Sequence, residues 1–251
     1  MIIRNEQECQ ILREGGNLLG KILQKIAESV KPGITTLDLD NLAEKLILEA
    51  GGRPSFKGYK NGKDGVPFPA SLCVSVNDEI VHGIPSDRIL QKGDIVGLDI
   101  GMEYKGLFTD TAVTVGVGQI TKENKHLISV TKKALQIGIA SIKAGGHIGD
   151  IGEAIQKYVE SKKFGVVRKL IGHGVGKKVH EDPEVPNWGE RGVGSELVEG
   201  MVLALEPMVT IGSYELNLAE NKWAWVTKDG KPAAHFEHTI VVTKTKAEII
   251  T

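Results

Sequence analysis

DIVGLDIGMEYKGLFTDTAVTVGVG, residues 94–118, decides the fold, because apolar and β-branched residues surround two aspartates in it. The alternation predicts a long β-hairpin over residues 93–118. If the chain turns at Tyr104-Lys105, Asp99 and Asp110 face each other on neighbouring strands, with Cβ atoms about 4.5–5.5 Å apart. Facing carboxylates repel, so a metal ion is the usual reason for such a pair. The alternative is a bulge that offsets the hairpin and lets both carboxylates reach solvent.

Further elements follow from the periodicity of apolar residues. Helices are expected over residues 6–30, from a cap at Thr36 or Asp38 to Gly51, over 122–142 and over 150–162. Strands are expected over residues 71–81, 201–211, 223–228 and 237–243, with mostly loop over 54–69 and 172–199.

The order of these elements repeats once along the chain. Acidic residues match acidic ones in the two copies, Asp99 with Glu206 and Asp110 with Glu237. We therefore predict a single domain, residues 1–251, with halves of about 1–120 and 121–251 related by a pseudo-two-fold. The expected class is α+β, with all strands in one antiparallel sheet and four helices on one face.

The pseudo-two-fold would bring the four carboxylates to one central point, where they need several protons or more than one divalent cation. Three histidines add to this set: His173 between glycines, His180 seven residues later, and His82. A lone histidine is more often a surface or satisfied core residue than a ligand, but flanking glycines allow close approach. Neutral imidazole favours Mn, Fe, Co or Zn over Ca.

Composition excludes several other classes of protein. The 251 residues are 41% apolar and 25% charged, which is a globular balance and not that of a disordered chain. A net charge of −1 gives no general attraction to nucleic acid or an anionic membrane. Two cysteines indicate a reducing compartment, and the chain shows neither a signal peptide nor an apolar run of about 20 residues. We expect a soluble, cytoplasmic monomer.

Seven short motifs occur in a fixed order along the chain. They are Val81-His82-Gly83-Ile84-Pro85, Asp99-Ile100-Gly101, Thr109-Asp110-Thr111, Gly172-His173-Gly174-Val175-Gly176, His180-Glu181-Asp182-Pro183, Glu206-Pro207 and Glu237-His238-Thr239. Together they resemble the type I methionine aminopeptidases, which have the pita-bread (creatinase/aminopeptidase) fold. The last two glutamates are 31 positions apart, which fits type I rather than type II. The resemblance is to the bacterial-style minimal form.

The resemblance implies a site for two divalent metal ions. Asp99 would bind one ion in bidentate fashion, Asp110 and Glu237 would bridge both, and His173 and Glu206 would bind the other. A water between the ions would attack, with Glu206 moving its proton. His180 would contact the scissile carbonyl and His82 the leaving side.

The implied substrate is the N-terminal methionine of peptides and nascent chains with a small second residue, and the ribosome is a possible partner. The family pattern suggests that the methionine pocket is lined by five residues, namely Tyr59, Phe68, Cys73, His82 and Trp223. This chain departs from many bacterial relatives at Phe56, at Val179 and in residues 60–67, where extra residues lie.

Three other interpretations stay open at this point. One is another enzyme of the same fold, such as an Xaa-Pro aminopeptidase, although those usually carry an extra N-terminal domain. A second is a non-catalytic binding protein of pita-bread shape, although such relatives lose metal ligands that are all present here. A third is a calcium-stabilised structural protein, against which His173 argues.

Overall fold

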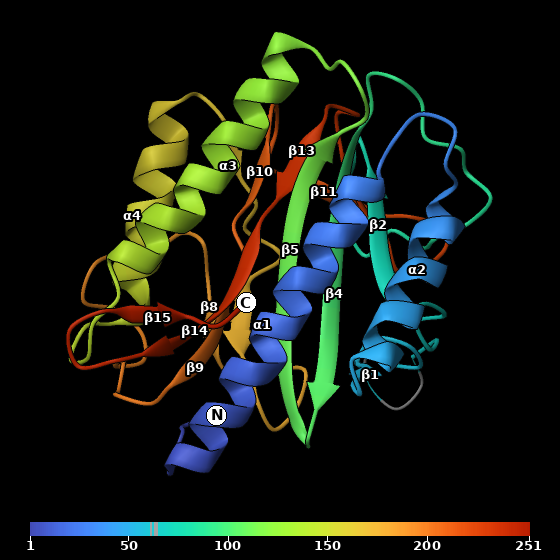
Figure 1. Cartoon of the computed structure of the whole chain (residues 1–251). Coiled ribbons are helices and arrows are strands. Elements are labelled where there is room, and N and C mark those ends of the chain that lie inside the picture. Colours follow the sequence, from blue (N-terminus) through green and yellow to red (C-terminus); the bar gives the residue numbers. More distant parts are fainter. Residues whose placement is uncertain (61, 63–64) are drawn as a thin grey trace.

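The computed structural model describes residues 1–60, 62 and 65–251. Its helices are α1 (Glu6–Ser29), α2 (Thr36–Glu49), α3 (Lys122–Ala140) and α4 (Ile148–Ser161). They lie together on one face of the central strands (Figure 1). The strands are β1 (Arg53–Pro54), β2 (Leu72–Val76), β3 (Glu79–Val81), β4 (Ile95–Tyr104), β5 (Leu107–Gly116), β6 (Gly165–Val166), β7 (Gly172–Gly174), β8 (Glu181–Val185), β9 (Val202–Leu205), β10 (Met208–Thr210), β11 (Leu216–Leu218), β12 (Trp225–Thr227), β13 (Ala233–His235), β14 (Glu237–Val242) and β15 (Ala247–Ile249).

The sheets are antiparallel in every described pair. The largest has the order β1-β4-β5-β14-β9-β7-β8, with β2 added on β4 and β15 on β14. At its centre the hairpin strands β4 and β5 mirror β9 and β14, as a pseudo-two-fold requires. The boundary of the halves, near residue 120, stays a prediction.

The expectation of a single sheet is wrong, because the described strands also form two smaller sheets, β13-β10-β6 and β11-β12-β3. The chain leaves the large sheet between Leu205 and Met208, where Pro207 has no N–H to donate to a strand ladder. Residues 172–199, expected to be mostly loop, contribute β7 and β8.

The register of the β4–β5 hairpin differs from the prediction by two residues. Tyr104 pairs with Leu107 across a turn at Lys105 and Gly106, which both have positive φ (50° and 84°). Asp99 therefore pairs with Ala112, and Asp110 pairs with Gly101, so the aspartates are diagonal neighbours and do not face each other directly. A shift of two keeps both side chains on one face of the sheet.

Alternation along the strands separates the core from this carboxylate face. In β4, Leu98 and Ile100 pack in a cluster with α1 and α2, whereas Asp99 points to the opposite face. In β14, Ile240 packs in the second cluster, with α3 and α4, and Glu237 lies on the other side. The helices thus cover the apolar face and leave the acidic face for a site.

The helices end within about two residues of the predicted positions: α3 ends at Ala140 rather than at 142, and α4 begins at Ile148 rather than at 150. The cap of α2 is Thr35, one residue before the predicted Thr36, and it exchanges hydrogen bonds with Asp38 in a capping box.

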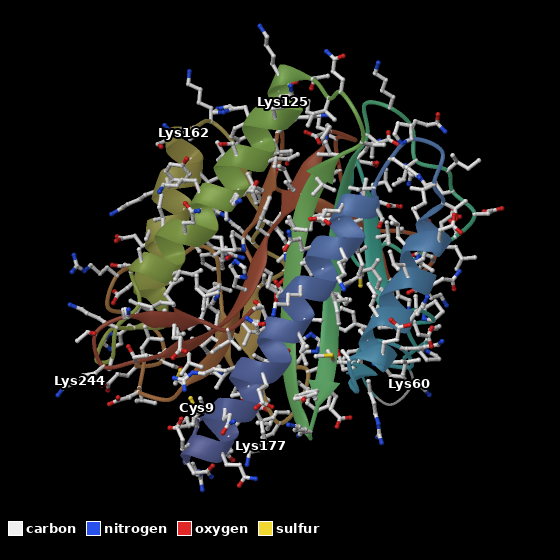
Figure 2. The ribbon with its side chains drawn as sticks, in the orientation of Figure 1. Cys9, Lys60, Lys125, Lys162, Lys177 and Lys244 are labelled. Carbon is white, nitrogen blue, oxygen red and sulfur yellow. The ribbon has the colours of Figure 1, made fainter. Side chains whose placement is uncertain are left out.

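Within the described residues, no helix combines the length and hydropathy that a membrane span needs. Both cysteines, Cys9 and Cys73, are free thiols. The lysines labelled in Figure 2 lie at separate edges of the molecule.

Candidate metal centre and active site

All the residues that sequence analysis singled out as ligands, catalytic groups or pocket walls line one pocket. Its lining consists of Phe56, Tyr59, Phe68, Cys73, His82, Asp99, Asp110, His173, His180, Glu206, Trp223 and Glu237. The four carboxyls come from β4, β5, the end of β9 and β14, so adjacent strands of the large sheet deliver them. Val179 is buried beside this pocket, in a cluster with Phe56 and Trp223.

One group of side chains has the arrangement of a metal site. Asp110, His173 and Glu237 each offer a ligand atom, and these atoms lie within 4.8 Å of one another. Among the described residues, Asp99 Oδ1 and Glu237 Oε1 are buried without a hydrogen-bond partner. Buried, unpartnered carboxylate oxygens beside an imidazole suit a divalent transition metal.

Burial changes the charge that these carboxyls can carry. It raises the pKa of Asp99 to about 7 and that of Glu206 to about 8. Burial also raises the pKa of Asp110 and Glu237 well above their usual values, helped in each case by neighbouring carboxylates. Protons or divalent cations must therefore balance the cluster, and the donor set fits cations.

His173 is arranged as a neutral ligand. Burial lowers its pKa to about 3, so the ring carries no charge near neutral pH. Its Nδ1 lies 2.9 Å from the Gly174 carbonyl oxygen, to which it can only donate. The lone pair of Nε2 then points toward the carboxyls, with Glu206 Oε1 3.6 Å away.

His180 stands at the open side of the pocket. Its Nδ1 is 2.7 Å from the Tyr59 hydroxyl, and its ring packs edge-on against His173 with centroids 4.3 Å apart. If the hydroxyl donates to Nδ1, the Nε2 of His180 carries a proton that it can give to a substrate oxygen.

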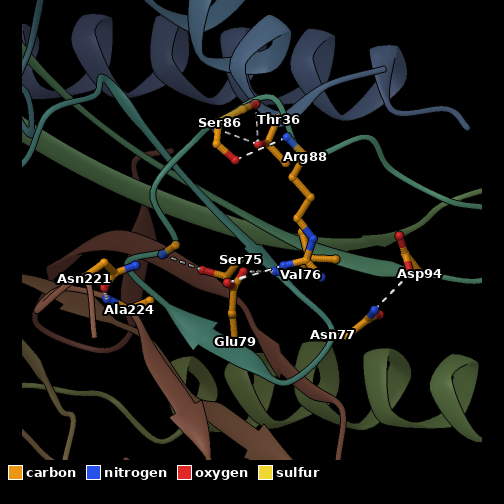
Figure 3. A network of polar contacts seen from close by, with 11 residues as sticks. Thr36, Ser75, Val76, Asn77, Glu79, Ser86, Arg88, Asp94, Asn221 and Ala224 are labelled. Atoms are coloured by element: carbon orange, nitrogen blue, oxygen red, sulfur yellow. Dashed lines mark hydrogen bonds and ion pairs between the residues drawn. The ribbon is translucent and has the colours of Figure 1, made fainter. Parts of the chain in front are cut away.

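The backbone that follows His82 is held by a polar network around β2 and β3. It has a left-handed backbone (φ 59°), and the following Gly83 N–H donates to Ser75 Oγ at 3.1 Å. A Cβ on Gly83 would lie 2.2 Å from the Val74 carbonyl oxygen, so the turn requires glycine. Figure 3 shows the surrounding bonds, including Val76 N–H to Glu79 Oε2 at 2.8 Å. Burial lowers the pKa of His82 to about 4, which leaves the ring neutral.

Aromatic side chains form an apolar wall next to the carboxyls. Phe68 and Trp223 meet edge-on with centroids 5.2 Å apart, and Cys73 of β2 is buried in the same cluster. Phe56 packs against Gly101, the partner of Asp110 in the hairpin. Of the extra residues 60–67, positions 61, 63 and 64 lie outside the described residues.

Sequence analysis missed one imidazole at this site. His235 ends β13, is 2% exposed, and places its Nε2 3.5 Å from Glu206 Oε2. The sequence could have indicated His235, because it lies two residues before Glu237 and side chains two residues apart on an extended chain point to the same side.

Comparison with known proteins shows the family of this chain. The profile of metallopeptidase family M24 matches residues 10–244. A methionine aminopeptidase of Clostridium acetobutylicum is 46% identical over all of this chain and 98% of its own length. Methionine aminopeptidase 1 of Bacillus subtilis is 46% identical, with 100% of this chain and 99% of its own covered.

Solved structures give the same relationship. The methionine aminopeptidase of Thermotoga maritima superposes with a TM-score of 0.95 at 41% identity, covering 100% of this chain and 99% of the other. The prolidase of Pyrococcus furiosus reaches a TM-score of 0.78 and covers 100% of this chain and 65% of its own, but at 19% identity the likeness shows the fold alone. The chain therefore belongs to metallopeptidase family M24, among the methionine aminopeptidases with the pita-bread fold.

Proposed function

We propose that the protein is a metal-dependent methionyl aminopeptidase that removes an N-terminal methionine when the second residue is small. The observation that carries this is the convergence of five candidate ligands in one pocket beside an apolar wall. Relatives 38–46% identical over nearly the whole chain carry the name methionine aminopeptidase.

We propose two divalent ions, of Co, Mn, Fe or Zn, as the cofactor. Five residues would hold them: Asp99, Asp110, His173, Glu206 and Glu237. When bound, such ions lower the pKa of a water and polarise a carbonyl group.

Three side chains have separate roles in the proposed reaction. Glu206 accepts the proton of the attacking water and passes it to the departing amine, a task that suits a carboxyl in a buried position. His180 donates from Nε2 to the scissile carbonyl oxygen, with Tyr59 fixing the tautomer from Nδ1. His82, held in its turn, contacts the peptide nitrogen on the leaving side.

The apolar wall selects the first residue of the substrate. A methionine thioether packs favourably against aromatic ring edges, and Phe56, Phe68 and Trp223 offer such edges, with Tyr59 and Cys73 beside them. We propose that nascent chains in the cytoplasm are the physiological substrates, that the ribosome is a partner, and that the protein acts as a monomer.

Peptide specificity tests this proposal. Release of methionine should be rapid from Met-Ala-Ser and Met-Gly-Ser and at least tenfold slower in kcat/KM from Met-Lys-Ser, about 1.4 kcal/mol. Ala-Pro-Ser serves as the control for an Xaa-Pro enzyme. Equal rates on the alanine and lysine peptides would reject the small-residue rule, and preferential cleavage of Ala-Pro-Ser would reject the assignment to methionine.

A further inference from the structure

A buried imidazole stands beside Glu206 without a part in the reaction described above. His235 is 2% exposed, and its Nε2 has no hydrogen-bond partner among the residues that the structure describes. A buried polar nitrogen without a partner is unfavourable and rare in folded proteins. The atom therefore calls for a partner in its immediate surroundings.

Glu206 supplies that partner. His235 Nε2 is 3.5 Å from Glu206 Oε2, and Glu206 Oε1 is 3.6 Å from His173 Nε2. Each carboxylate oxygen thus faces a different imidazole. The usual N–H···O distance is about 2.9–3.0 Å, so a movement of about half an ångström makes the His235 contact a hydrogen bond.

The backbone of His235 is hydrogen-bonded at both of its polar groups. Thr114 Oγ1 accepts from the His235 N–H at 2.9 Å and donates to the His235 carbonyl at 2.8 Å. These two bonds tie the end of β13 to β5. Glu206 lies in the break between β9 and β10, where its backbone carbonyl accepts a hydrogen bond from Asn187 Nδ2 at 3.0 Å. Because the His235 backbone is tied to β5 and its ring is buried, His235 can orient the longer glutamate side chain.

We propose that His235 is a positioning residue whose Nε2–H donates to Glu206 Oε2 and so fixes which oxygen of Glu206 faces His173. An ionised carboxylate only accepts hydrogen bonds, so Nε2 of His235 must carry the proton. A His235 that bound metal through Nε2 would need that nitrogen unprotonated, so the two roles predict opposite tautomers. This proposal rests on the proposed function of Glu206.

The tautomer is measured first, on the wild-type protein. A long-range ¹H–¹⁵N spectrum of ¹⁵N-histidine-labelled, Zn²⁺-loaded protein should show Nε2 of His235 protonated, with His235→Gln identifying the signal. An unprotonated or metal-shifted Nε2 would overturn the proposal, and it would make His235 a ligand instead.

Variants then measure the effect on the site. In His235→Leu, the Zn²⁺ dissociation constant from calorimetry and kcat on Met-Ala-Ser should each worsen about 10–100-fold, with KM little changed. His235→Gln keeps an N–H donor and should recover most of both losses. His126→Gln, at an exposed position of α3, is the control.

The outcomes are distinguishable from failure of the enzyme assignment. If the leucine and glutamine variants behave alike while wild type releases methionine, the positioning role is wrong and the function stands. If wild type binds Zn²⁺ but releases no methionine, the function is wrong. If circular dichroism shows that His235→Leu does not fold, the protonation of His235 Nε2 in the wild-type protein alone decides whether the positioning role is correct.

Discussion

Removing one of the buried carboxyls should stabilise the metal-free protein while destroying its metal site. The change with the clearest expectation is Asp99→Asn, because Asp99 is buried beside Glu206 and Asp110 and its pKa is raised from 3.8 to about 7. Asparagine has nearly the same shape and no charge to bury. It can also donate to the Asp110 carboxyl.

The expected change in the stability of the metal-free protein follows from the difference between the pKa of Asp99 in the folded chain and in the unfolded chain. The unfolded chain loses the Asp99 proton near pH 4 and the folded chain near pH 7, so the fold loses stability as pH rises between these values. Three pKa units correspond to about 4 kcal/mol of lost stability, and the whole of this loss applies at pH 8. Asp99→Asn should therefore raise the Tm of the metal-free protein at pH 8 by roughly 8 °C, and by much less near pH 4.

Thermal unfolding of wild type and Asp99→Asn in EDTA, at pH 5 and pH 8, measures this difference. Added Mn²⁺ should raise the Tm of wild type and have little effect on the variant. Asp87→Asn, at an exposed position, is the control. A variant less stable than wild type at pH 8, or a difference that does not change with pH, would refute the reasoning.

Three further predictions concern the chemistry of the pocket. Glu206→Gln should lower kcat on Met-Ala-Ser by about 10²–10⁴-fold in stopped assays of methionine release, because the proton acceptor is lost; near-normal turnover would exclude that role. Tyr59→Phe removes the 2.7 Å bond to His180 and should lower kcat/KM about tenfold in the same assay, with an unchanged result showing that the bond is dispensable. Gly101→Ala would place a Cβ 2.2 Å from Ser55 Oγ and 2.8 Å from the Phe56 ring and should raise KM for methionine peptides, whereas the same change at Gly97 of the same strand, where a Cβ would have no neighbour nearer than 3.7 Å, should not.

Metal binding should also release protons, because carboxyls with raised pKa must ionise to act as ligands. Calorimetric titration of Zn²⁺ at pH 7 in two buffers of different ionisation enthalpy measures the number released. A heat that does not depend on the buffer would contradict the protonated state of the metal-free site.

Alternation along the strands made the carboxylate face predictable. Asp99 and Asp110 share a face in any register that preserves the period of two, so their proximity follows from the sequence alone. The register itself depends on the turn. Lys105 takes a positive φ there, and the sequence does not indicate this because lysine is not typical of that conformation.

Contacts between distant segments could not be predicted in the same way. One strand was expected over residues 201–211, so neither the break at Pro207 that separates β9 from β10 nor the pairing of β10 with β13 and β6 was predicted. The contact between His235 and Glu206 depends on that pairing, because β13 carries His235 to the end of β9. The bond between Tyr59 and His180 likewise joins two loops, whose conformations depend on packing rather than on periodicity.

We infer that the buried carboxyls and His173 form a metal-dependent aminopeptidase site. Release of free methionine from Met-Ala-Ser tests it most directly, with Mn²⁺ or Co²⁺ present, with EDTA, and in Asp110→Asn. We predict release that needs metal and is abolished both by EDTA and by the substitution. Release that persists in excess EDTA, or no release from folded wild-type protein shown by calorimetry to have bound metal, would contradict the account.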